Sequence, residues 1–275
     1  MKRLLKVVML GLLISSVAAS ADTYSIKSSS INCGGGVGAS SAYTVNGTAG
    51  QAAVGFSTSQ SFVHWTGFWA GEIPAPVVAA TPAAAKMLAD GAFISTAGKI
   101  ATTSRTDFTD CFYIEEMDRS SGIRVSVPTA AINGLNRGSV VNVIGTMATA
   151  GSGERQISGP VVIIVGTHAP LGPLGMVNRS VGGDYLNGQC GVIDGNGLNN
   201  IGLLIQTWGT VIGSPAQSLL VDDGSGTPVM LDTAWLASTP EVGSYVSVVG
   251  VSSLPISGNK ARLIIPRNSD DVIVR

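Results

Sequence analysis

Two eight-residue segments of this chain share a pattern that constrains the whole fold. The first, Gly138-Ser-Val-Val-Asn-Val-Ile-Gly145, returns as Gly243-Ser-Tyr-Val-Ser-Val-Val-Gly250. In each copy, glycines bound a run rich in β-branched residues, which is typical of a strand between turns. The repeated alternate positions predict a strand face that lies in a core, and they are occupied by Val141 and Val143 in one copy and by Val246 and Val248 in the other.

The segments around these two octets repeat as well. The step from Glu115 to Gly138 is 23 residues, and the step from Asp222 to Gly243 is 21. In each copy three strand signals precede the octet, a short connector follows the third, and a further strand signal follows the octet. This order predicts two five-stranded barrels of the OB type, over residues 87–166 and 197–275. Abundant glycine (36 residues) and few charged residues (12%) also favour an all-β chain.

The first residues are typical of an export signal. Lys2, Arg3 and Lys6 flank the start of a short apolar run, and 19–21 reads Ala-Ser-Ala, a small-x-small cleavage site. We therefore expect residues 1–21 to be removed and the mature chain to begin at Asp22. A membrane anchor is the alternative, but the apolar run is too short for one. The prediction is an exported protein of the extracellular space, periplasm or cell surface, without a membrane span after cleavage.

Three further segments complete the expected organisation. Residues 22–73 predict a small β module with strands near 24–27, 42–45 and 61–65, and with turns at Cys33-Gly-Gly-Gly36 and Asn46-Gly47. Residues 74–86 are rich in proline and alanine and predict a linker without core contacts. Residues 167–196, rich in glycine, proline and asparagine, predict a long ordered connector between the barrels.

Several motifs resemble those of known protein families. The stretch Tyr43-Thr-Val-Asn-Gly-Thr-Ala-Gly-Gln51 with Gly67-Phe-Trp69 resembles a short β segment near the N-termini of many bacterial secreted proteins. Phe112-Tyr-Ile-Glu-Glu116 and Gly122-Ile-Arg-Val125, together with the octet, resemble tandem OB-fold domains of exported bacterial proteins, some of which bind nucleic acids. The resemblance implies two OB folds behind that N-terminal segment. It is more specific for fold than for function.

No catalytic or metal-binding motif stands out in the sequence. The chain has two histidines in different regions and lacks a nucleophile elbow, a zinc-protease motif and a phosphate loop. Glu115 and Glu116 end a predicted strand, where alternation turns them to opposite faces, and we expect a solvated strand end there. The run Asp194-Gly-Asn-Gly-Leu-Asn199 begins like a calcium loop, but Leu198 stands where an oxygen ligand is needed. The sequence therefore predicts a protein that is not an enzyme, with no metal and no cofactor.

The three cysteines leave their pairing open. Cys33, Cys111 and Cys190 are far apart in the chain and odd in number. Export permits disulfides, so one disulfide or none are both compatible with the sequence, with at least one free thiol.

The candidate ligand-binding residues lie on the first barrel. OB folds bind through strands two and three and the loops beside them. Alternation places Phe112, Ile114, Ile123 and Val125 in the core and turns Tyr113 and Arg124 outward. Arg105 and Phe108 lie in the first loop and Arg155 in the last. An aromatic ring beside guanidinium groups could stack on and pair with a single-stranded nucleic acid or a sugar. The alternative is a solvent-facing Tyr113 beside an Arg124 that pairs with Glu115.

The net charge of the chain and the outward residues of the second barrel disfavour a dedicated nucleic-acid binder. Removal of three of the 16 basic residues with the signal leaves 13 against 17 acidic ones, a net charge of −4. The outward positions of the second barrel are Leu220, Met230 and Asp232, without an aromatic–cation pair, and we expect Trp208 to be a core residue. We read this barrel as structural or as a protein-contact surface.

Three functions are compatible with the sequence. The first is an exported, non-catalytic binding or interaction protein of the cell envelope or surface, with a polymer or a protein as its partner. The second is a nucleic-acid-binding OB-fold protein that takes single strands through the first barrel; the resemblance favours it and the charge opposes it. The third is a cryptic secreted hydrolase or an accessory domain of one.

Overall fold

A computed structural model describes residues 34–39, 44–49, 55–58, 63–66 and 75–275, except 216, 235 and 257. In the N-terminal region β1 (Gly34–Ala39) pairs antiparallel with β2 (Thr44–Ala49), and β3 (Gly55–Thr58) pairs antiparallel with β4 (Val63–Thr66). The turns predicted at these glycines are wrong, because residues 34–36 lie inside β1 and residues 46–47 lie inside β2. The export signal, the strand expected at 24–27 and the ending at 67–69 lie outside the described residues.

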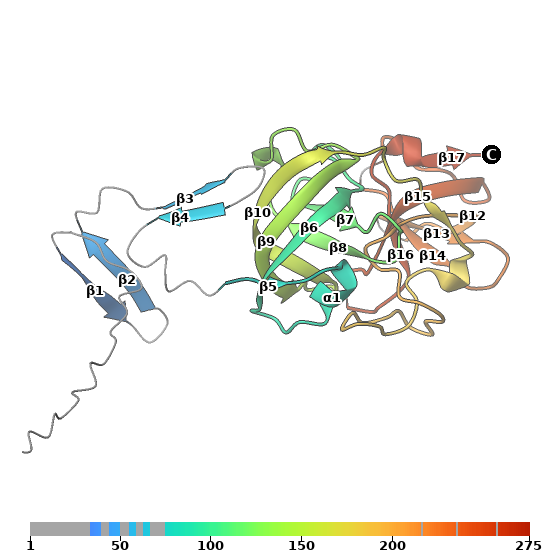
Figure 1. Cartoon of the computed structure of the whole chain (residues 1–275). Helices are drawn as coiled ribbons and strands as arrows, with labels where there is room; N and C mark the ends of the chain where they lie inside the picture. The colour runs from blue at the N-terminus through green and yellow to red at the C-terminus, as the bar shows by residue number, and fades with distance from the viewer. Residues whose placement is uncertain are drawn as a thin grey trace, which may run out of the picture. The chain divides into compact units, whose positions relative to one another are not determined.

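The first barrel is a closed, five-stranded sheet. Its order is β6-β7-β8-β10-β9, and β9 pairs back with β6 to close it (Figure 1). Strands β8 and β10 are parallel, whereas the other neighbours are antiparallel. The strands are β6 (Phe93–Ala101), β7 (Cys111–Glu115), β8 (Gly122–Ser126), β9 (Ser139–Thr149) and β10 (Arg155–Thr167). A 3-10 turn, η2 (Thr129–Ala131), lies in the connector before β9.

The second barrel repeats this topology. Its order is β12-β13-β14-β16-β15, closed by the β12–β15 pair, with β14 and β16 parallel. The strands are β12 (Leu204–Gly213), β13 (Ser218–Asp222), β14 (Val229–Asp232), β15 (Tyr245–Ser253) and β16 (Leu263–Ile265). After η4 (Ser269–Asp271), β17 (Val272–Val274) pairs antiparallel with residues 246–248 of β15, which precede the part of β15 that pairs with β16. The predicted pair of five-stranded, OB-like barrels is confirmed by this strand order.

The two glycines of each octet have separate physical reasons. The first adopts a left-handed backbone, with φ +90° at Gly138 and +95° at Gly243, which favours glycine. The second lies against the neighbouring strand, where a Cβ at Gly145 would be 2.6 Å from Ile157 Cγ2 and one at Gly250 would be 2.5 Å from the same atom of Ile264. The alternate valines Val141, Val143, Val246 and Val248 are buried in the two cores, as predicted.

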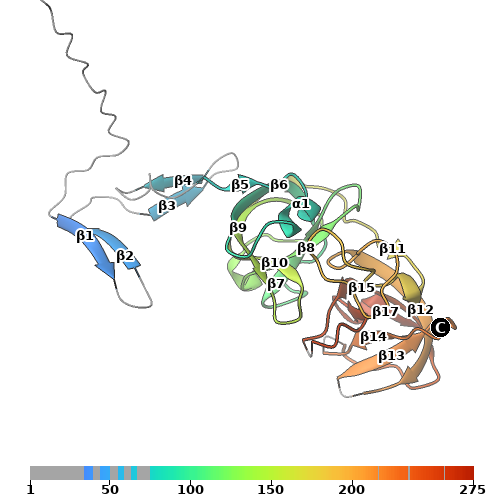
Figure 2. The ribbon, with the colours of Figure 1, turned by 90° about the horizontal axis from the view of Figure 1, so that it is seen from below.

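The segment expected as a linker instead packs on the first barrel. Strand β5 (Val77–Val78) pairs in parallel with β6, and helix α1 (Pro82–Lys86) begins at the N-cap Thr81, whose hydroxyl accepts from the amide of Ala84 at 3.0 Å. Ala79 and Ala85 are buried in the barrel core. Figure 2 shows α1 over one open end of that barrel. The expectation that 74–86 lacks core contacts is therefore wrong for its described residues. Two of its alanines, Ala79 and Ala85, pack with the larger side chains of the barrel core.

The connector between the barrels is held by buried amide side chains. It contains β11 (Leu174–Gly175), which pairs in parallel with β12, and the 3-10 turn η3 (Asn178–Ser180). Asn178 is fully buried, donates to the carbonyl of Val221 at 2.8 Å and accepts from the hydroxyl of Thr207 at 2.6 Å. Gln189 is fully buried as well, and its Oε1 accepts from the amide of Arg155 at 2.8 Å. The irregular backbone of the connector is thus fixed by polar contacts with strands of both barrels.

Buried polar groups join the first barrel to the second. The Glu115 carboxylate accepts from the amide of Leu204 at 2.5 Å and pairs with Arg119 at 2.7 Å, and Arg119 donates to the carbonyl of Leu204 at 2.8 Å. Lys86 Nζ donates to the carbonyl of Ile201 at 2.7 Å. Glu115 was expected at a solvated strand end, which is wrong: its side chain has no exposed area. The cost of burying its charge is offset by the Leu204 amide of the second barrel and by Arg119 of the turn between β7 and β8.

One expected core residue faces solvent. Trp208 on β12 is 38% exposed, although we expected it in the core. The two neighbouring positions face the interior. The Thr207 hydroxyl donates to the buried Asn178, and a Cβ at Gly209 would be 2.4 Å from the carbonyl oxygen of Asp222. Strand alternation therefore turns Trp208 outward. None of the helices in the described part of the chain is long and apolar enough to cross a membrane.

Candidate functional site

Two of the five predicted ligand-binding residues meet in a small buried cluster. Tyr113 lies on β7 and points out of the first barrel, as alternation predicts, while Phe112 and Ile114 point in. Its ring packs edge-to-face on Phe108, with 6.1 Å between centroids and 78° between planes. The outward face is not open, however: Tyr113 is only 1% exposed because Val251 of the second barrel packs on it. The face habitually used by OB folds is covered here.

Arg124 lies beside Tyr113 and holds a carboxylate of the preceding loop. It is the cross-strand partner of Tyr113 on β8. Its guanidinium donates to Asp110 at 2.8 Å and to Gln156 at 2.9 Å. The alternative pairing of Arg124 with Glu115 is wrong, since Glu115 pairs with Arg119. Arg124 is therefore anchored, and its side chain keeps some exposure at the edge of the cluster.

The other two predicted arginines lie elsewhere. Arg155 begins β10 rather than lying in a loop, is buried, and pairs with Asp90 while donating to the carbonyls of Lys86 and Leu88. Arg105 is exposed, and the one hydrogen bond of its side chain to a described residue goes to Asn133, at 3.5 Å. The structure thus brings together Phe108, Tyr113 and Arg124, but not Arg105 or Arg155.

A cleft of about 360 Å³ opens beside this cluster, between the two barrels. We call it the inter-barrel cleft. The first barrel contributes Phe108, Cys111, Tyr113 and Arg124, among others. The second contributes an apolar wall made of Met230, Leu254, Pro255, Ile256, Leu263 and Ile265. Ile256 is 87% exposed at the rim. A concave, mostly apolar hollow with a few converging polar groups is the usual form of a ligand site.

The charges of the inter-barrel cleft are mainly negative. Arg124 is its one basic residue among the described ones, and Asp110, Glu154 and Asp232 are its carboxylates. Asp110 neutralises Arg124 directly. A site of this sign repels phosphate groups and accommodates neutral or cationic ones.

Sequence reasoning missed Glu154, which lies at the bottom of this cleft. Its Oε2 accepts from Tyr113 Oη at 3.2 Å and from Ser253 Oγ at 2.9 Å, so it links the barrels. Its Oε1 has no hydrogen-bond partner among the described residues. Burial raises the pKa of this carboxyl, partly offset by the nearby Arg124. No signal in the sequence distinguishes this single glutamate in a turn, because its partners come from distant strands.

The cleft's potential nucleophiles are held in their protonated forms. Burial raises the pKa of the Cys111 thiol to about 12 and raises that of the Tyr113 phenol well above its ordinary value. A thiol with such a pKa contains almost no thiolate at neutral pH and is a poor nucleophile. Cys111 and Cys190 are both free thiols, while Cys33 lies outside the described residues.

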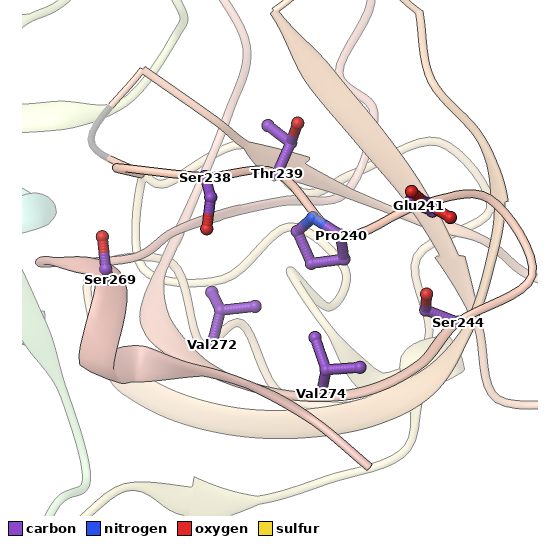
Figure 3. Close-up of a pocket in the computed structure, with 8 residues that line it drawn as sticks. All are labelled: Ser238, Thr239, Pro240, Glu241, Ser244, Ser269, Val272 and Val274. Carbon is purple, nitrogen blue, oxygen red and sulfur yellow. The ribbon is translucent and has the colours of Figure 1, made fainter.

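A smaller hollow lies on the second barrel and shares no lining residue with the inter-barrel cleft. It measures about 300 Å³ and is formed by the connector before β15 together with η4 and β17. Figure 3 shows the Pro240 ring with the side chains of Val272 and Val274 below it, and serine hydroxyls at the sides. Its only charged residue among those described is Glu241. It offers few converging polar groups, so the inter-barrel cleft is the stronger candidate.

The described residues contain no group of three or more His, Cys, Asp or Glu side chains that could hold a metal ion. The calcium-like run at 194–199 forms turns, and its Asp194 has a positive φ of 50°.

Comparisons with known proteins add little. No protein-family model matches the chain, and no curated protein matches it in sequence. Among solved structures, the HINa domain of Ifi202, in a crystal structure with 20-bp double-stranded DNA, is similar to it at 11% identity and a TM-score of 0.31. That match covers 68% of this chain and 97% of the HINa chain. A TM-score this low carries no argument, so the OB-like assignment rests on the strand order.

Proposed function

We propose that the protein is an exported, non-catalytic binding protein whose ligand occupies the inter-barrel cleft. The observation that carries the proposal is the cleft itself: an apolar wall from the second barrel faces Tyr113, Arg124 and Glu154 of the first. The protonated state of Cys111 and Tyr113 supports binding rather than nucleophilic catalysis. Export is supported by the signal-like residues 1–21.

The lining of the cleft also defines the kind of ligand. An apolar group would bury against Met230, Leu263 and Ile265, whose contact gains about 25 cal/mol for each Å² removed from water. A neutral or cationic polar group would lie near Glu154 and Asp232. We therefore favour a ligand that combines an apolar part with a neutral or positive one, such as a segment of a surface protein.

The first test uses a neutral apolar dye, Nile red, with the mature chain from Asp22. We expect dye fluorescence to rise on binding, and Ile256→Ser to weaken the affinity by about fivefold, since it removes apolar contact at the rim. Val242→Ser is the matched control, because Val242 is also exposed but lies outside the cleft. Equal affinities for the two variants would place the dye elsewhere.

A second test separates the ligand classes. Short peptides of one apolar composition, carrying either lysine or glutamate, are compared with single-stranded oligonucleotides and oligosaccharides by thermal shift. We expect the lysine peptides to raise the Tm most. Salt-dependent oligonucleotide binding that is lost in Arg124→Ala would instead support a nucleic-acid binder, and turnover of common hydrolase substrates would support an enzyme. Export is tested by mass spectrometry of the secreted chain, which should begin at Asp22.

A further inference from the structure

A third hollow lies on the second barrel and shares no lining residue with the inter-barrel cleft. It measures about 370 Å³, and we call it the two-arginine pocket. Arg179 comes from η3 and Arg262 from the residue before β16, while Thr227 comes from the turn before β14. Asp194 and Asn196 of the connector complete its polar lining. Residues from four separate segments thus converge on one hollow.

Arg262 carries a buried charge that forms no direct ion pair with a carboxylate of the described residues. The residue is only 8% exposed, and none of the ion pairs in the described part of the chain includes it. Its guanidinium donates to the carbonyls of Ile193 at 3.1 Å and Asp194 at 2.8 Å, and more weakly to that of Arg179 at 3.5 Å. Its Nε has no hydrogen-bond partner among the described residues. Its direct hydrogen bonds thus go to neutral carbonyls, and the Asp194 carboxylate acts on it only from a distance, which compensates part of the buried charge.

Arg179 brings a second positive charge to the same pocket. Its side chain is exposed, and the one hydrogen bond of its guanidinium to a described residue goes to the carbonyl of Ser225, at 3.5 Å. Burial lowers the pKa of Arg262; the nearby Asp194 carboxylate partly offsets this shift, and the positive charge of Arg179 adds to it, so the two cations lie close enough to repel each other. An arginine nevertheless stays charged at neutral pH. Asp194 is the one carboxylate in the lining among the described residues, which leaves the pocket with a net positive charge.

We propose that the two-arginine pocket binds a small tetrahedral oxyanion, a phosphate or a sulfate group. Guanidinium groups pair with such anions through parallel hydrogen bonds, which makes arginine well suited to them. Arg179 has donors that the protein does not use, and Thr227 adds a hydroxyl to the lining. The anion would balance the positive charge that remains in the pocket, where two arginines face the single carboxylate of Asp194 among the described residues. This site is independent of the inter-barrel cleft, whose carboxylates favour the opposite charge.

The test titrates inorganic phosphate and sulfate into the mature chain at constant ionic strength, with chloride as the reference, using calorimetry and thermal shift. Glycerol phosphate forms a further arm. Binding of both phosphates indicates a site that takes an esterified group, whereas binding of inorganic phosphate alone indicates a site for the free ion. If neither phosphate nor sulfate binds better than chloride, the proposal is wrong.

Two variants locate the site. Because Arg262 is buried, Arg262→Gln could unfold the barrel, so the decisive variant is the exposed Arg179→Gln. We expect it to weaken phosphate binding about tenfold or more, as is typical when a charged hydrogen bond is removed. Arg105→Gln is the matched control, an exposed arginine on the first barrel, and should bind phosphate like the unmodified chain. Equal affinities in the two variants would refute the site.

Discussion

The contact between Gly122 and Gly202 gives the sharpest test of how the barrels are joined. Gly122 begins β8 in the first barrel, and Gly202 precedes β12 in the second. A Cβ at Gly122 would lie 2.3 Å from the carbonyl oxygen of Gly202 and 2.8 Å from its carbonyl carbon. Both are backbone atoms, and Gly202 is fixed by a 2.7 Å hydrogen bond from its amide to Ser252. Gly122→Ala would therefore force the two barrels apart.

The cost of that substitution can be worked from the neighbouring contacts. Overpacking a tight contact typically costs about 1–3 kcal/mol. The same separation would strain the bond from the Leu204 amide to the Glu115 carboxylate and that from Arg119 to the Leu204 carbonyl. Losing one hydrogen bond to a charged group costs about 1.5–3 kcal/mol. We therefore expect Gly122→Ala to lower the free energy of unfolding by about 2.5–6 kcal/mol.

Urea denaturation of the mature chain measures this effect, and Gly166→Ala provides the control. Gly166 also lies in a strand, but a Cβ there would meet nothing within 4 Å. Because the added methyl group would contact nothing, Gly166→Ala should alter the free energy of unfolding by no more than about 0.5 kcal/mol. If Gly122→Ala unfolds at the same urea concentration as Gly166→Ala, the barrels do not meet at these glycines and the reasoning about the interface fails.

Three further outcomes test the buried groups and the octets. Because its folded pKa is raised, Glu154 contributes stability that is full below its unfolded pKa of about 4.3 and is lost as pH rises through the folded value. The stability of Glu154→Gln to urea, relative to that of the unmodified chain, should therefore rise from about pH 4.5 to about pH 7. If the free energies of unfolding of the two proteins change with pH in parallel, this prediction is wrong. Burial lowers the pKa of the nearby Lys86 to about 8, so Lys86 remains protonated over that range. Cys111 should resist iodoacetamide at pH 8 in the folded chain and react in urea, as followed by peptide mass spectrometry; rapid labelling of the folded chain would disprove its burial. In thermal unfolding, Gly138→Ala should cost more than Gly243→Ala. Both need a left-handed backbone, at about 1–2 kcal/mol, but only the first would also strike a carbonyl oxygen, 2.3 Å away. Equal costs would count against that contact.

The sequence was sufficient to predict the barrels because their signals are local. Strand alternation depends only on residues two positions apart in the chain. It correctly predicted that the alternate valines of the octets, and Phe112 and Ile114, lie in the cores. Strand lengths were less well predicted. Strand β9 continues to Thr149, well beyond the second glycine of its octet, because Gly145 allows close packing on Ile157 without ending the strand.

The candidate site was harder to predict because burial at the interface depends on distant partners. Tyr113 alternates outward, as expected, but the residue that covers it, Val251, belongs to the other barrel. Glu115 is buried through a bond to Leu204, 89 residues further along the chain. Neither partner can be inferred from periodicity, which assigns a face to a residue but not what lies against that face.

The repeat begins earlier in each copy than the barrels themselves. The amide of Ala79 donates to the carbonyl of Ser95 at 2.8 Å, and that of Met176 donates to the carbonyl of Gln206 at 2.9 Å. In both copies a short parallel strand, β5 or β11, precedes a helical turn and then the first barrel strand. The proline- and alanine-rich segment is therefore the first part of a duplicated unit, which explains why it packs on the barrel core.

Two duplicated units that pack through different surfaces cannot present the same face to a ligand. The β7–β8 face of the first barrel is covered by the β12, β15 and β16 side of the second, so the contact is heterologous. On the corresponding β13–β14 face of the second barrel, Leu220, Met230 and Asp232 stay partly exposed, and Met230 and Asp232 border the inter-barrel cleft. Duplication thus preserved the octets that form the cores, while the packing of one copy on the other created a cleft that neither barrel contains alone.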